Sequence, residues 1–134
     1  LEIVAGETDV NNSWNFNGLT RGEADIVVPE GFEVRITFRN GDTASPHSLG
    51  IEEVQEPWPA TFADPSPVFE GAITSNPTSM TDATPPGESE EIAFTADSAG
   101  EYAVVCYLPG HALTGMWTYF VVSAEGAAGV RERG

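Results

Sequence analysis

Three side chains that bind soft metal ions lie close together near the end of this sequence. The only cysteine, Cys106, is followed by His111 and Met116 at the spacing C-x4-H-x4-M. Pro109 and Gly110 lie between the first two, and such turn-forming residues let a loop fold back on itself. We therefore expect the sulfur, imidazole and thioether groups to point toward one place.

The second histidine, His47, lies almost sixty residues upstream at the start of a short extended segment. If the fold brings this segment beside Cys106, the chain offers two imidazoles, one thiolate and one thioether. Two histidines and a cysteine with a weak methionine ligand are typical of electron-transferring copper sites. Thiolate and thioether favour Cu(I), and imidazole binds both oxidation states. The sequence thus predicts one copper ion, cycling between Cu(I) and Cu(II), held by His47, Cys106, His111 and Met116.

Each of these residues alone has a more ordinary interpretation. A single buried cysteine is usually a small apolar core residue, and a methionine beside a tryptophan usually fills a core. The copper prediction rests on the conjunction of all four. Met80, in contrast, is interpreted as packing. Ser48 directly follows His47, and we expect it to donate a hydrogen bond to the Cys106 sulfur and tune the site; the alternative is a serine bonded to water.

Alternating apolar residues predict the strands that must position these ligands. Short segments of this kind, separated by Gly, Pro and Asn turns, indicate an all-β fold, a Greek-key β-sandwich. The length of 134 residues fits one domain covering residues 1–134. The predicted strands lie near residues 26–28, 34–38, 47–51, 92–95, 102–106 and 116–122.

Two segments depart from the strand pattern. Residues 52–89 hold many prolines and several apolar residues, and we interpret them as a long Pro-rich insertion folded as a lid over the sandwich. Residues 126–134 are rich in glycine and alanine and are predicted to form a frayed tail.

The charge of the chain excludes one class of partner. Five arginines, no lysine and 21 acidic residues give a formal net charge of −16, which is unsuited to nucleic acid. The acidity has two interpretations: steering toward a basic redox partner, or solvation in a salty habitat. The spread of the acids along the chain favours the second. No apolar run is long enough to span a membrane.

Taken together, the motifs resemble those of the cupredoxin family, most of all sulfocyanins and next rusticyanins. The resemblance covers most of the chain outside residues 52–89 and the tail. It is carried by Trp14-Asn15-Phe16-Asn17-Gly18, by Pro46-His47-Ser48-Leu49, and by the loop from Cys106 through His111-Ala112 to Gly115-Met116-Trp117.

The resemblance implies a blue copper site with His47, Cys106 and His111 as equatorial ligands and Met116 as the axial ligand. It also implies a carrier in a respiratory chain, with a membrane oxidase, a cytochrome or another donor or acceptor as its redox partner. We expect a monomer located outside the cytoplasm, in the periplasm or on the outer face of the membrane. Because the chain starts at Leu1 without a visible signal, we expect that a leader or anchor was removed.

The apolar neighbours of His111 predict where electrons pass to a partner: a docking patch made by Leu108, Pro109, Ala112 and Leu113. Enzymatic copper sites need more cysteines or histidines than this chain has, so we expect no enzyme activity. The remaining alternative is a copper-binding protein that is not a carrier, either a copper chaperone or a site that binds or senses a small ligand.

Overall fold

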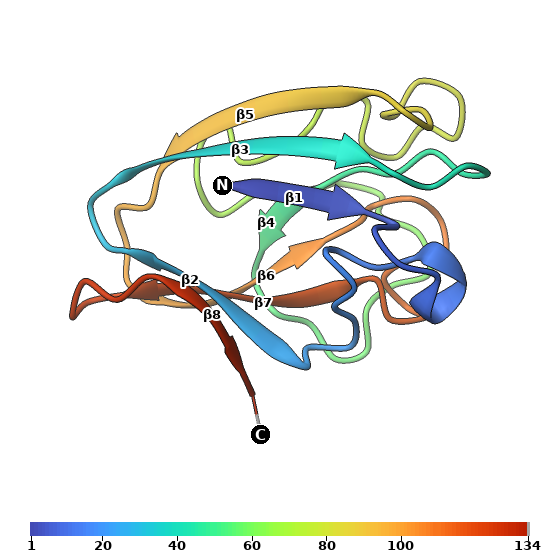
Figure 1. Cartoon of the computed structure of the whole chain (residues 1–134). Helices are drawn as coiled ribbons and strands as arrows, with labels where there is room; N and C mark the ends of the chain where they lie inside the picture. Colours follow the sequence, from blue (N-terminus) through green and yellow to red (C-terminus); the bar gives the residue numbers. More distant parts are fainter. Residues whose placement is uncertain (134) are drawn as a thin grey trace.

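The computed structural model describes residues 1–133, which form two layered β-sheets (Figure 1). This confirms the predicted all-β sandwich. Among the described residues, no helix has the length and hydropathy needed to cross a membrane. One sheet has the order β1 (Glu2–Ala5), β3 (Glu33–Asn40), β5 (Ser89–Thr95); the other has the order β4 (Gly50–Glu52), β6 (Gly100–Val105), β7 (Trp117–Ser123), β2 (Ala24–Pro29), β8 (Gly129–Glu132).

The main core lies between the two sheets. Along β3 the residues Val34, Ile36 and Phe38 are buried while their neighbours are exposed, which is the alternation expected of a strand with one solvated face. Ile36 pairs with Ile92 of β5 in an antiparallel register. Across the sandwich these side chains join a buried cluster that includes Phe120 of β7.

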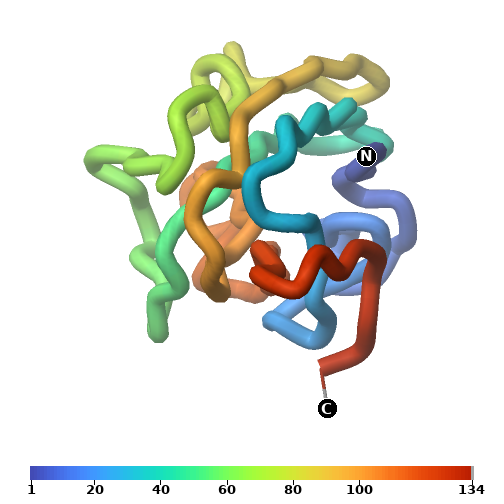
Figure 2. Tube along the Cα trace, turned by 90° about the vertical axis from the view of Figure 1, so that its left-hand side faces the viewer, coloured from blue at the N-terminus to red at the C-terminus, as the bar shows by residue number. Residues whose placement is uncertain are grey.

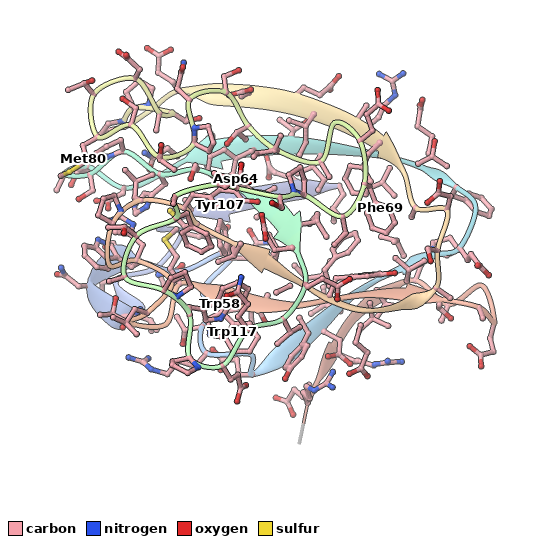
Figure 3. The ribbon with its side chains drawn as sticks, turned by 180° about the vertical axis from the view of Figure 1, so that it is seen from behind. Trp58, Asp64, Phe69, Met80, Tyr107 and Trp117 are labelled. Carbon is pink, nitrogen blue, oxygen red and sulfur yellow. The ribbon has the colours of Figure 1, made fainter. Side chains whose placement is uncertain are left out.

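A second, smaller apolar cluster covers the outer face of β6 and β7. Trp58 packs against Trp117 with ring centroids 5.7 Å apart, and Tyr107 belongs to the same cluster (Figure 3). Because both of its faces are covered, β7 is apolar along nearly its whole length rather than alternating.

The predicted insertion begins and ends in strands, and residues 53–88 between β4 and β5 run outside the two sheets, as the green-to-yellow part of the trace shows (Figure 2). The segment is tied to the sandwich where Thr84 pairs with His47 and Ile73 pairs with Gly50, and Phe69 is buried against the core. Its role as a lid stays a prediction. Met80, interpreted above as packing, is instead 69% exposed at the edge of the molecule (Figure 3).

The C-terminal segment corrects one expectation. Residues 126–134 are predicted to fray, and Gly134 lies outside the described residues. Within the described part of this segment, however, β8 pairs antiparallel with β2. The physical reason is a pair of arginines: Arg131 and Arg133 both bond the buried Asp25 carboxylate, at 2.9 and 2.6 Å. The Arg133 guanidinium also lies over the Tyr119 ring, 3.6 Å from its centroid. These contacts hold a strand that its glycine-rich composition did not predict.

Candidate metal centre

The connection between β6 and β7 brings the first three candidate ligands together. Cys106 directly follows β6 and Met116 directly precedes β7, and the Cys106 N–H donates to the Met116 carbonyl at 3.3 Å. The Met116 N–H in turn donates to the His111 carbonyl at 2.9 Å. The loop therefore folds back as its turn residues predicted, with Gly110 and Gly115 at positive φ.

His47 reaches the same place through the neighbouring strand. β4 pairs with β6 so that Gly50 lies opposite Val105, and His47 just before β4 exchanges two backbone hydrogen bonds of 3.1 Å with Thr84. Its Nδ1 lies 3.9 Å from the Cys106 sulfur, while the Nδ1 of His111 lies 3.5 Å from it. All three donor atoms lie within 4.8 Å of one another.

These distances suit a shared metal ion. With metal–nitrogen bonds of about 2.0 Å and a metal–sulfur bond of about 2.3 Å, trigonal ligation puts the nitrogen and sulfur about 3.7 Å apart. The observed separations of 3.9 and 3.5 Å lie on either side of that value. Cys106 and His47 are fully buried and His111 is 6% exposed, so the site is closed to bulk water. The donor set is the one that copper prefers.

Met116 is fully buried and belongs to the same apolar cluster as Cys106. Its assignment as the fourth ligand stays a proposal. Met80, the other methionine, lies on the surface and apart from this cluster, so the two methionines have different surroundings.

A carboxylate that sequence reasoning missed orients His47. Asp42 Oδ2 lies 2.8 Å from His47 Nε2, and both side chains are buried. A proton held on Nε2 by this contact leaves the Nδ1 lone pair free to bind a metal ion, as in other sites where a carboxylate fixes the histidine tautomer. In the sequence, Asp42 belongs to an Asn-Gly-Asp turn, so only its position five residues before His47 could have indicated this role.

Burial sets the protonation of the donors. It lowers the pKa of His111, together with the nearby His47, to about 4. Burial also lowers the pKa of His47, although Asp42 opposes this. Both imidazoles are therefore neutral and able to bind a cation at neutral pH. Burial raises the pKa of the Cys106 thiol to about 11, so this group loses its proton when a metal cation compensates the charge.

Ser48 makes the hydrogen bond that its position predicted. Its backbone N–H donates to the Cys106 sulfur at 3.4 Å, and its hydroxyl lies 3.8 Å from the same atom. The hydroxyl oxygen also accepts the Tyr107 N–H at 3.0 Å. The influence of Ser48 on the redox potential stays a prediction.

The predicted docking patch is only partly on the surface. Pro109 is exposed and Leu113 is 50% exposed, but Leu108 and Ala112 are buried. Their side chains point inward because the loop packs one face against the site and against the outer cluster that contains Ala112. A surface contact at this loop therefore relies on Pro109 and Leu113.

Comparisons with known proteins agree with this geometry. The family described as the Sulfocyanin (SoxE) domain matches residues 1–129. Sulfocyanin of Sulfolobus acidocaldarius is 33% identical over 127 residues, which cover 92% of this chain and 62% of the relative. The chain thus spans less than two thirds of the length of that curated relative.

Solved structures show the same likeness. Rusticyanin from Thiobacillus ferrooxidans is 28% identical, with a TM-score of 0.52 over 74% of this chain and 60% of the other. Dithionite-reduced auracyanin from the photosynthetic bacterium Roseiflexus castenholzii is also 28% identical. Its TM-score is 0.59, and the match covers 91% of this chain and 94% of the other.

Proposed function

The chain belongs to the sulfocyanin family of cupredoxins, and from this premise we propose that it carries single electrons between redox proteins through one copper ion. The observation that carries the proposal is the convergence of His47, Cys106 and His111 at distances that suit trigonal ligation. Copper bound there would supply a one-electron couple between Cu(I) and Cu(II). We propose Met116 as the weak fourth ligand.

The residues around the site support electron transfer rather than chemistry on a substrate. His47 and Cys106 are fully buried and His111 nearly so, which leaves a substrate no approach to the ligands, whereas an electron can pass through packed side chains. Asp42 holds His47 in place, and the Ser48 N–H holds the sulfur. Ligands fixed in this way move little when the charge of the site changes. The protein then acts as a carrier and not as an enzyme.

The proposal extends to partner and location. Its partners are redox proteins, such as a membrane oxidase or a cytochrome, met one at a time by a monomeric carrier outside the cytoplasm. The support for this part is the family membership. Steering by the net charge of −16, the other of the two interpretations of the acidity, would require a partner with a basic surface. A basic partner predicts that association weakens as salt is added.

The test is to add Cu(II) to the apoprotein and record the visible spectrum and the voltammogram. We expect an intense thiolate-to-copper band and a reversible one-electron wave, both lost in Cys106→Ala. Met116→Leu and Met80→Leu form a matched pair, because the structure buries the first and exposes the second. The first should shift the potential and the second should not. A colourless product would refute the copper site. Rapid loss of copper to a chelator would favour a chaperone or sensor instead.

A further inference from the structure

The indole of Trp14 covers one face of His111. The two rings are stacked, with their centroids 3.8 Å apart and their planes 19° from parallel. His111 directs its Nδ1 toward the Cys106 sulfur, and a face-on stack leaves that nitrogen unobstructed. Trp14 itself is only partly buried. The indole therefore forms a contact between the surface of the molecule and His111, which is the least buried of the three metal-ligating side chains.

An unusual backbone turn places Trp14 there. The three preceding residues, Asn11, Asn12 and Ser13, all have left-handed φ angles of 56°, 59° and 65°. Among non-glycine residues asparagine adopts this conformation most readily, but usually as a single residue; three in a row persist where surrounding contacts enforce them, often at functional sites. Asn11 supplies two such contacts. Its backbone carbonyl accepts the backbone N–H of Trp14 at 3.0 Å, and its side-chain amide donates to the backbone carbonyl of Trp14 at 3.0 Å.

Arg21 ties this turn to the ligand loop. Its Nη2 donates to the Asn11 side-chain oxygen at 2.9 Å and to the Thr114 carbonyl at 3.1 Å. Its backbone N–H donates to the Gly115 carbonyl at 2.9 Å. A side chain at position 115 would collide with Arg21, so this glycine is required by close packing as well as by its φ of 116°. The turn, which forms η1 (Val10–Ser13), is thus held against the loop that carries His111 (Figure 1).

The other two metal-ligating side chains, His47 and Cys106, have no such contact with the molecular surface. His47 and Cys106 are fully buried, and His111 is 6% exposed, so the imidazole edge itself offers a partner little surface. We propose that Trp14 is the contact through which electrons enter and leave at His111, and that Arg21 is the positioning residue that keeps the indole stacked. The inference rests on the proposed function. In self-exchange one electron passes from a reduced molecule to an oxidised one, with no bond made or broken and no proton moved.

The first experiment measures self-exchange between oxidised and reduced copper protein. Trp14→Leu should keep the thiolate-to-copper band while exchange slows severalfold, and Trp14→Phe should restore most of the rate because it keeps an aromatic face. Phe32→Leu, which alters an exposed aromatic in the turn between β2 and β3, is the control and should leave the rate unchanged. A Trp14→Leu protein that keeps the band and exchanges at the wild-type rate would overturn the inference.

A second measurement needs no substitution. Unlabelled Cu(II) protein is added to the ¹⁵N-labelled Zn(II) form, which exchanges no electrons, and paramagnetic broadening then maps the encounter surface. The Trp14 indole N–H should be among the most broadened signals; broadening confined to other surfaces would overturn the inference, even if Trp14→Leu fails to bind copper. A wild-type protein without the thiolate-to-copper band would instead overturn the proposed function, so the two failures are distinguishable.

Discussion

Ser48→Ala removes a hydroxyl that serves two partners at once. The oxygen accepts the buried Tyr107 N–H at 3.0 Å, which leaves its own hydrogen free to point toward the Cys106 sulfur at 3.8 Å. The backbone N–H of residue 48, which donates to the same sulfur at 3.4 Å, does not depend on the side chain. The substitution therefore leaves one buried N–H without its acceptor and takes one hydrogen-bond donor away from the sulfur.

Two magnitudes follow from these contacts. A buried N–H without a partner costs about 1–3 kcal/mol of unfolding free energy. A donor facing the sulfur withdraws electron density from it and so favours the reduced site. At 3.8 Å the bond is weak, and we assign it about 0.5–1.5 kcal/mol. Since about 59 mV corresponds to a tenfold change for one electron, Ser48→Ala should lower the redox potential by about 20–65 mV.

Thr74→Val is the matched control. Thr74 Oγ1 accepts the Leu49 N–H at 3.0 Å and donates to the Leu49 carbonyl. The substitution therefore also leaves a buried N–H, that of Leu49 next to Ser48, without its acceptor, but it removes no hydrogen-bond donor from the sulfur. Urea unfolding of the apoproteins should show similar destabilisation in both variants, whereas voltammetry should show a lower potential in Ser48→Ala alone. An unchanged or raised potential in Ser48→Ala with its band intact, or an equal shift in both variants, would refute the reasoning.

Three further predictions concern other parts of the molecule. Burial raises the pKa of Asp25, but hydrogen bonds from the two arginines of the C-terminal segment outweigh it, and the net pKa lies below the ordinary 3.8. The ionised Asp25 carboxylate therefore adds about 1–2 kcal/mol to the free energy of unfolding, after allowance for the partly exposed arginines. This stabilisation is present above pH ~4 and is lost as the pH falls through the folded pKa. Urea unfolding of the wild type and of Asp25→Asn at several pH values should show that the difference in unfolding free energy between them shrinks in acid. A difference that does not change with pH would contradict this prediction. Gly50→Ala puts a methyl group into the buried Tyr107 phenol and should cost about 1–3 kcal/mol in urea unfolding; a neutral substitution would show that the ring can move aside. Leu113→Asp, at a half-exposed position, should slow exchange with a redox partner in stopped-flow kinetics while the visible band stays unchanged, and unaltered kinetics would remove this loop from the docking surface.

The ligand-bearing part of the site could be predicted because residue types alone limited the choices. With one cysteine and two histidines in the chain, a soft metal site could use few combinations, and the loop spacing after Cys106 made one of them compact. Alternation of apolar residues indicated β3 correctly, because a strand with one buried face repeats every two residues. The loop spacing and the alternation are local in the chain, whereas His47, almost sixty residues upstream, could be included only because the chain has two histidines.

The remaining features depend on contacts between distant segments. The stack of Trp14 on His111 requires three successive left-handed residues, and the tolerance of asparagine for this conformation does not predict such a run. The burial of Leu108 and Ala112 depends on which face of the loop meets the rest of the fold, and an apolar loop sequence does not reveal this. Arg131 lies in a segment predicted to fray, and its ion pair with Asp25 of β2 joins residues more than one hundred positions apart, which the local sequence does not reveal.

The strand at the C-terminal end also protects the molecule from its own copies. In the sheet order β4-β6-β7-β2-β8, β8 takes the edge position from β2, so a four-residue strand with the charged side chains of Arg131 and Glu132 replaces a six-residue, mostly apolar strand at the edge. Such open edges are templates on which a second chain can add a strand, and they lead to aggregation. All four β8 residues are exposed and add little to the core. Their main role is therefore to keep the protein from associating with its own copies. We expect a chain cut before β8 to keep its metal site and yet to aggregate.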